Sequence, residues 1–178
     1  MRKFLSRFLP ARQNFDQYRW LKPFGSRLHH PSLWHLNRHS TAGGLAVGLF
    51  CGLVPGPLQV LSATVVSVIW RVNLPLAVLT TLYTNPLTIV PLYMAAYQLG
   101  VWVTGSPNGL QTIHFPELHW NDWLSELVRW TLQLGTPLLI GVPLLALALA
   151  LAGYFVTRLI WRVTVVLKWR ARKRRRVG

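Results

Sequence analysis

The chain has 178 residues and a formal net charge of +15, and 52% of its residues are apolar while only 13% are charged. Soluble domains carry about 25% charged residues, so this composition argues against a soluble globular fold and favours an integral membrane protein. Cys51 is the single cysteine, which excludes an intrachain disulfide and a cysteine-rich metal site.

Both ends of the chain are basic. Residues 1–40 predict a basic and aromatic cytoplasmic region that lies at the membrane interface. Residues 161–178 predict a basic cytoplasmic tail that contains "KWRARKRRR". Such a tail could bind nucleic acid, but directly after a membrane helix it more simply sets orientation and attracts anionic lipid head groups. The predicted partners are therefore anionic membrane lipids and not nucleic acid.

The first apolar segment, residues 41–70, is interrupted by Pro55, Gly56 and Pro57. Its two arms would extend about 21 and 20 Å as helices, and neither crosses a hydrocarbon core of about 30 Å. A re-entrant hairpin returns Arg71 to the cytoplasmic side, where positive charge is favoured, so we predict a hairpin. The alternative of one kinked crossing, with Arg71 outside, stays open.

The rest of the membrane domain, residues 41–160 as a whole, is predicted in three parts. Residues 74–104 form a transmembrane helix broken at "TNP", and residues 130–160 form a return helix. Between them, residues 105–127 hold three of the four acidic residues and no Lys or Arg, so this loop is predicted to be external. The fold class is all-α, multi-pass, with both termini cytoplasmic.

The proline breaks create a hydrogen-bonding problem. Pro55 cannot donate to the carbonyl of Cys51, four residues earlier. Pro57 likewise leaves the carbonyl of Leu53 without a donor, and Pro86 does the same at the second break. An unsatisfied backbone group in hydrocarbon costs several kcal/mol. The two breaks are therefore expected to be buried against each other or to line a wet cavity.

Each break also has the pattern of a helix start. Asn85 can cap the N–H of Leu87 or Thr88, and Pro86 suits the first helical position. Two helix N-termini that meet inside a membrane would attract an anionic group, although proline breaks also serve packing alone. The candidate substrate or packing site consists of Pro55, Gly56, Pro57, Gln59, Arg71, Asn85, Pro86 and Thr88.

Gly44, Gly48 and Gly52 recur every four residues and predict a helix-packing face. This face could pair the two arms of the hairpin or two subunits. Because so small a bundle has little protein with which to bury its polar breaks, we expect a homodimer or larger assembly.

No constellation of catalytic or metal-binding residues stands out. His35 and His39 are four apart, but no carboxylate or cysteine lies near them, so we interpret them as interfacial. Glu117, Asp122 and Glu126 lie among tryptophans typical of a membrane interface, and not in the setting of a two-carboxylate hydrolase. The protein is predicted not to be an enzyme and to need no cofactor or metal.

Residues 42–100 resemble a bacterial family known as domain-of-unknown-function family 2062. The elements that carry the resemblance are Gly48, Phe50, Gly52 and Pro55, then Gln59, then Arg71, Asn73 and Pro75, and finally Asn85, Pro86, Thr88, Pro91 and Tyr93. The segment "LWHLNRHS" (33–40) is similar to members from Gram-negative bacteria. The resemblance implies a small bacterial inner-membrane protein and implies no activity.

Two functions fit these observations. In the first, the paired helix N-termini bind or move an anionic solute or lipid head group. In the second, the breaks serve packing only, and the protein is a non-transporting scaffold for a partner in envelope biogenesis, whose identity the sequence does not indicate.

Overall fold

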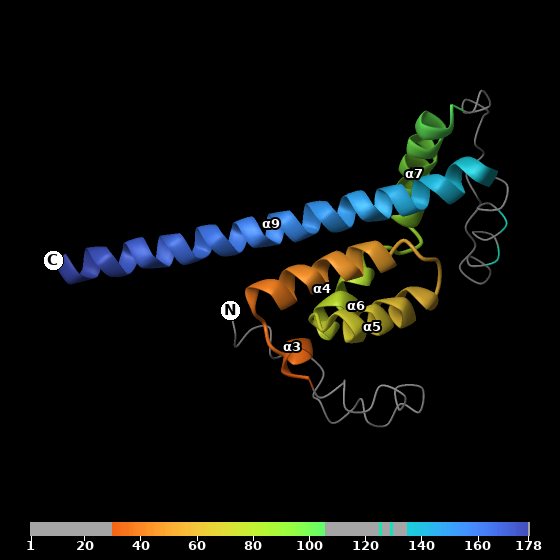
Figure 1. Cartoon of the computed structure of the whole chain (residues 1–178). Helices are drawn as coiled ribbons and strands as arrows, with labels where there is room; N and C mark the ends of the chain where they lie inside the picture. Colours follow the sequence, from red (N-terminus) through yellow and green to blue (C-terminus); the bar gives the residue numbers. More distant parts are fainter. Residues whose placement is uncertain (1–29, 106–124, 126–128, 130–134, 178) are drawn as a thin grey trace.

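The structure is a computed structural model that describes residues 30–105, 125, 129 and 135–177 (Figure 1). This part of the chain is helical and contains no strand, which confirms the all-α prediction. Most of the predicted external loop and most of the N-terminal interfacial region lie outside the described residues. The helices are α3 (Pro31–Trp34), α4 (Arg38–Cys51), α5 (Leu58–Trp70), α6 (Leu74–Thr81), α7 (Ile89–Thr104) and α9 (Gly135–Val177).

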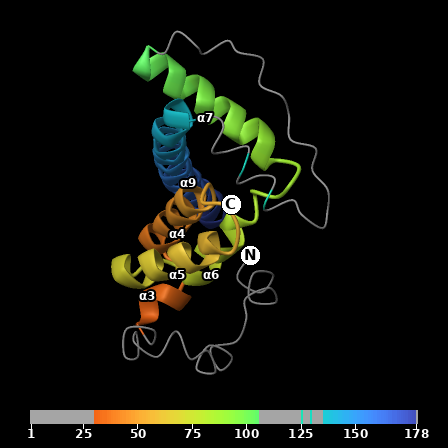
Figure 2. The same cartoon turned by 90° about the vertical axis from the view of Figure 1, so that its right-hand side faces the viewer.

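Helices α4, α5 and α6 pack on one another to form a small block (Figures 1 and 2). The chain reverses after α4, so that α5 runs back alongside it, and the segment 41–70 contains two separate helices in place of one kinked helix. Helix α3 closes one end of the block, where Leu33 packs on Val68 of α5 and Leu74 of α6.

The glycine face of α4 lies against α6. A side chain on any of these glycines would collide with that helix or with a residue just before or just after it: a Cβ on Gly44 would lie 2.6 Å from the carbonyl oxygen of Asn73, which precedes α6. The neighbours of Gly44, Gly48 and Gly52 are Asn73, Ala77, Thr80 and Tyr83. Small residues thus allow two helices to approach closely, and the partner is α6, which neither of the sequence-based alternatives named.

Helix α7 packs on α9 and runs across it (Figures 1 and 2). The crossing is formed by small residues on both helices, because a Cβ on Gly100 would overlap the backbone of Pro137 and a Cβ on Gly141 would overlap that of Ala96. Helices α6 and α7 therefore pack on different neighbours. The predicted broken helix over 74–104 is two helices that do not continue one another in direction.

Helix α9 is the longest element, at 43 residues. It packs along α4, with Gly153 next to Leu45 and Leu49, and then extends beyond the block as an arm (Figure 1). The predicted return helix ended at residue 160, but α9 continues through the basic tail to Val177. Lys and Arg are good helix formers, so nothing in the tail ends the helix.

Only α9 is long and apolar enough to cross a membrane within the part of the chain that the structure describes. Its candidate span is Gly135–Leu167, and the other apolar helices of the described residues are shorter, at Leu58–Trp70 and Ile89–Thr104. The multi-pass topology predicted from the sequence is therefore still a prediction.

The α7–α9 crossing provides a stability test. Replacing glycine by alanine inside a helix ordinarily stabilises it by about 1 kcal/mol. We expect Gly141→Ala to destabilise the protein by about 1–3 kcal/mol, because the added methyl group meets the backbone of α7. The measurement is the thermal unfolding midpoint of the purified protein in detergent.

Gly153→Ala is the matched control, because there the added methyl meets side-chain atoms of Leu49 and Leu45, which can move, and no backbone. Equal midpoints for the two variants would contradict the close crossing of α7 and α9.

Candidate functional site at the two helix breaks

The first break covers residues 52–57, between α4 and α5. The carbonyl of Cys51, which the sequence leaves without a helical donor, accepts a hydrogen bond from the N–H of Val54 (3.0 Å). The chain then turns at Gly56, whose φ of 71° is readily adopted only by glycine. Helix α5 begins one residue after Pro57.

The second break covers residues 82–88, between α6 and α7. The side-chain oxygen of Asn85 accepts from the N–H groups of Leu87 and Thr88, each at 3.0 Å, in the arrangement expected from the sequence. Helix α7 begins at Ile89 and not directly at Pro86, although the N–H of Ile89 already bonds to the carbonyl of Asn85 (2.9 Å). Asn85 therefore organises the turn that leads into α7.

Three hydroxyl groups join the two breaks. Each comes from the second break or from α7, and each donates to a carbonyl at the end of α4 or just beyond it. The pairs are Tyr83 to Leu49 (2.8 Å), Thr84 to Gly52 (2.6 Å) and Tyr93 to Leu53 (2.8 Å). The carbonyl of Leu53, left without a helical donor by Pro57, is thereby satisfied from α7. At Leu53 a protein hydroxyl therefore supplies the hydrogen bond that Pro57 removed.

The hydroxyl of Thr84 lies at the centre of this contact. Its oxygen is 2.6 Å from the carbonyl oxygen of Gly52, 2.8 Å from the side-chain oxygen of Gln59 and 3.0 Å from the carbonyl oxygen of Thr81. Thr84 is only 7% exposed. The break thus brings together the C-terminal ends of α4 and α6, which carry partial negative charge.

The N-terminal ends of α5 and α7 have few free donors. The N–H groups of Gln59 and Val60 bond back to Gly56 and Pro57, each at 3.3 Å. At α7 the first N–H groups are held by Asn85. The donors that the sequence assigned to an anion are therefore mostly used by the chain itself.

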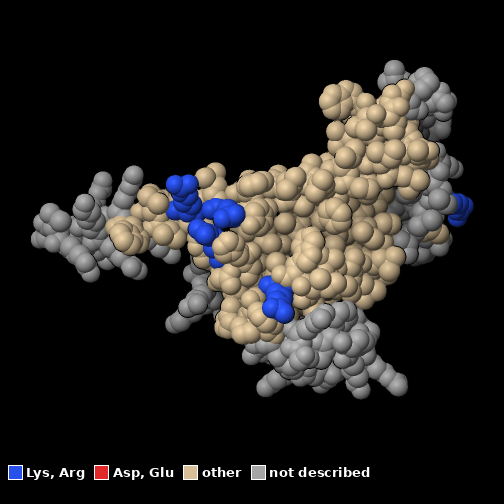
Figure 3. Space-filling view, viewed as in Figure 1, with Lys and Arg blue, Asp and Glu red and all other residues tan. Residues whose placement is uncertain are grey.

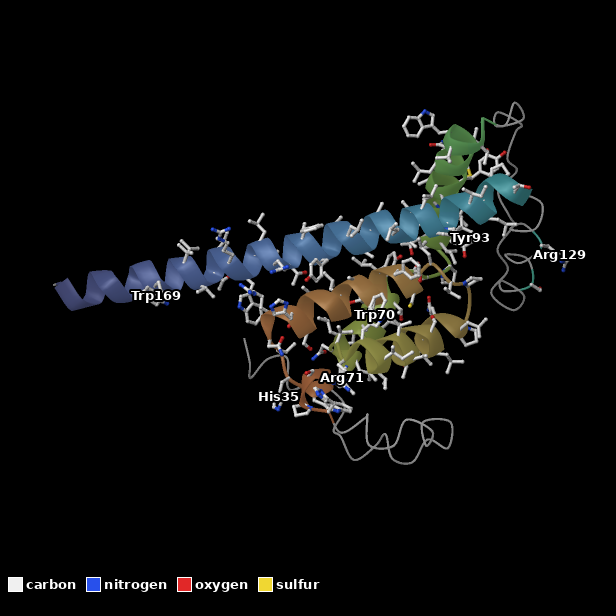
Figure 4. All side chains as sticks on the ribbon, in the orientation of Figure 1. His35, Trp70, Arg71, Tyr93, Arg129 and Trp169 are labelled. Carbon is white, nitrogen blue, oxygen red and sulfur yellow. The ribbon has the colours of Figure 1, made fainter. Side chains whose placement is uncertain are left out.

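Arg71, also predicted as part of the site, lies away from the breaks. It follows the last residue of α5, and Figure 4 shows it beside α3, at the opposite end of the block from Tyr93. Its backbone adopts the left-handed conformation (φ 54°), the single such case among the described non-glycine residues. The turn is held by Ser67, whose carbonyl accepts from the N–H groups of both Arg71 and Val72.

The arginines of the described residues gather at this same end. Figure 3 shows blue side chains over α9 and the neighbouring end of the block, and no acidic residue occurs in the described ranges. The residues concerned are Arg38, Arg71, Arg158 and Arg162. Arg158 is held over the ring of Tyr154, 5.4 Å from its centre. Arg129 lies apart from the group (Figure 4).

Four residues that hold the breaks or the opposite end of the block in place had no role predicted from the sequence. Asn73 is fully buried, and its side chain caps α6 by accepting from Leu76 N–H (2.9 Å), while its own N–H donates to the carbonyl of Ser40 (3.1 Å). Tyr83, Thr84 and Tyr93 are the hydroxyl donors described above. Buried hydroxyls in an apolar segment need hydrogen-bond partners, and this requirement is the feature of the sequence that could have indicated a role for Tyr83, Thr84 and Tyr93.

The described residues contain no group of three or more His, Cys, Asp or Glu side chains that could hold a metal ion. His35 and His39 lie at the α3 end of the block and are exposed. Glu117, Asp122 and Glu126 fall outside the described residues.

Comparison with known protein families identifies the family of this chain. Residues 21–170 match the family described as "Uncharacterized protein conserved in bacteria (DUF2062)". The protein belongs to this family, which confirms the resemblance drawn from its motifs. No curated protein and no solved structure matches it.

Removing one hydroxyl should show that these bonds hold the breaks together. We expect Tyr93→Phe to destabilise the protein by about 1–3 kcal/mol, because the buried carbonyl of Leu53 loses its donor. Tyr97→Phe in the same helix is the control, since the Tyr97 hydroxyl makes no hydrogen bond within the described residues. Thermal unfolding in detergent measures both, and equal midpoints would contradict the assigned role of Tyr93.

Proposed function

We propose that the protein is a small multi-pass protein of the bacterial cytoplasmic membrane that acts as a non-transporting scaffold for a partner in envelope biogenesis. Its proposed lipid partners are anionic head groups, and a homo-oligomer is the proposed assembly. The observation that supports the scaffold is the set of bonds by which hydroxyls of the second break and of α7 donate to carbonyls at the first break.

The surface of α9 supports a membrane location. Only 11% of its most apolar window is buried within the protein, whereas the core helix of a soluble protein is mostly buried. Residues 135–157 carry no charge and extend about 34 Å as a helix, which matches a hydrocarbon core of about 30 Å. Large apolar side chains such as Leu139, Leu151 and Phe155 are at least half exposed, as contact with lipid would require.

The end of the block where Arg38, Arg71, Arg158 and Arg162 gather supports the proposed orientation in the membrane. Positive residues stay on the cytoplasmic side, so this end and both termini are proposed to be cytoplasmic. Ala146, midway along the uncharged part of α9, belongs to the same apolar cluster as Leu53 at the first break. The breaks then lie near the middle of the membrane, and α4 and α5 form a re-entrant pair in the cytoplasmic half.

The position of α7 refines the proposed path of the chain. Helix α7 runs across α9 and does not continue α6. In the proposed topology the chain therefore crosses to the external side of the membrane through α6, the second break and α7 in turn. Trp102 near the end of α7 is 83% exposed. Tryptophan is common at the membrane–water interface, which is where this arrangement puts the end of α7.

Transport of an anionic solute or lipid head group is the second candidate. The observation in its favour is that Pro57 and Asn85 are exposed at the surface of the breaks. Against it, the N–H donors of α5 and α7 that would hold an anion are mostly used within the chain. Water at the breaks separates the two functions, because transport needs an aqueous path and a scaffold does not.

Thiol labelling tests this proposal. In a Cys51→Ala background, single cysteines at Gly56, Asn85 and Arg71 are exposed to a charged, membrane-impermeant thiol reagent in whole cells and in inverted vesicles. We expect Arg71→Cys to react only in inverted vesicles, because that end is cytoplasmic. We expect Gly56→Cys and Asn85→Cys to stay unlabelled from both sides.

Labelling of the break positions would contradict the scaffold and favour transport. Labelling of Arg71→Cys from outside would instead contradict the proposed orientation, while leaving the role of the breaks open to the same two readings.

A further inference from the structure

The oxygen atoms around Thr84 outnumber the protons available to them. A threonine hydroxyl has one proton, yet three oxygen acceptors lie within 3.0 Å of Thr84 Oγ1. The carbonyl of Thr81 also accepts from the N–H of Thr84 (3.3 Å). The hydroxyl proton can satisfy either the carbonyl of Gly52 or the side-chain oxygen of Gln59, and the other of these two then faces a lone pair of Oγ1. That remaining oxygen–oxygen contact is repulsive unless a cation lies between the atoms or one acceptor is replaced by a donor.

The surroundings of this cluster are electrostatically negative. Gly52 follows the last residue of α4 and Thr81 is the last residue of α6, so their carbonyls are at helix C-termini, each equivalent to roughly half a negative charge. The described arginines lie elsewhere: Arg71 is at the far end of α5, about 20 Å along that helix. No described cationic side chain balances the oxygens.

We propose that Thr84 Oγ1, the carbonyl oxygens of Gly52 and Thr81, and the side-chain oxygen of Gln59 form a binding site for a monovalent metal cation such as Na⁺ or K⁺. Hard cations prefer oxygen ligands. The set contains no carboxylate, which favours a single positive charge over Ca²⁺ or Mg²⁺. Carbonyls at interrupted helices bind Na⁺ in the same manner in membrane transporters.

The burial of the site makes the cation an internal component of the fold. Thr84 is 93% buried, and its oxygens come from both breaks, so a cation there links α4, α5 and α6. The inference holds for a scaffold as well as for a transporter, because it concerns what is held at the breaks and not whether anything passes through them.

The competing arrangement is a rotated Gln59 amide. If its nitrogen faced Thr84, it would donate to the hydroxyl, and the hydroxyl would donate to Gly52, with no cation required. The two arrangements differ in their response to Gln59→Glu. If a cation is bound, the carboxylate of Gln59→Glu strengthens its binding. If the Gln59 amide nitrogen donates to Thr84 instead, the carboxylate replaces that donor with an acceptor and destabilises the contact.

The test measures the thermal unfolding midpoint of the full-length protein in neutral detergent, in NaCl, in KCl and in choline chloride at equal ionic strength. We expect Na⁺ or K⁺ to raise the midpoint by about 3 °C over choline. Thr84→Val should abolish this increment, whatever its effect on the midpoint itself. Thr64→Val is the matched control and should keep the increment, because the hydroxyl of buried Thr64 donates within its own helix, to the carbonyl of Val60 (2.7 Å).

Gln59→Glu should reach the same increment at a cation concentration about tenfold lower. This variant keeps the proposal testable if Thr84→Val does not fold. Equal midpoints of the unaltered protein in all three salts would overturn the site, and so would an increment that survives Thr84→Val. A Gln59→Glu variant that is destabilised and unresponsive to Na⁺ and K⁺ would establish the rotated amide instead.

Discussion

The need to satisfy backbone carbonyls that proline leaves without donors governs this structure. Every helix of the block is short, and α4 and α6 both end where the chain approaches a proline. In an apolar setting each freed carbonyl must find a partner. The carbonyl of Cys51 finds its partner in the N–H of Val54 within the first break, and the carbonyl of Leu53 finds it in the hydroxyl of Tyr93 on α7. Tyr83 and Thr84, in the second break, donate to two further carbonyls at the end of α4. The two breaks are therefore one structural unit, although they are far apart in the sequence.

The rest of the fold brings these hydroxyls to those carbonyls. The glycine face of α4 lets α6 approach closely, which carries the second break to the end of α4. Asn73 supports this contact from the other end, because it caps α6 and donates to Ser40 at the start of α4. Helix α9 then covers α4 and crosses α7 at Gly141, so that one long helix holds the block and α7 together.

Local features of this fold were readable from the sequence, and long-range ones were not. The positions of both breaks and the cap formed by Asn85 follow from the backbone chemistry of proline and asparagine, which acts over four residues or fewer. The choice of α6 as the partner of the glycine face depends on the path of the chain through two turns. The roles of Thr84 and Tyr93 depend on it too, since a hydroxyl in an apolar segment indicates that a partner exists but not which one. The extension of α9 was missed because a change in charge was taken for the end of a helix.

The direct test of the joined breaks is a cross-link between them in native membranes. In a Cys51→Ala background, cysteines replace Gln59 and Thr84, whose side-chain oxygens lie 2.8 Å apart, and a short bifunctional thiol reagent is added. We predict rapid linkage within one chain, detected because both thiols no longer react with a maleimide that is added afterwards. The control pair, Gln59→Cys with Arg71→Cys, lies at opposite ends of α5, about 18 Å apart. Linkage of the first pair no faster than that of the control would contradict the contact between the two breaks.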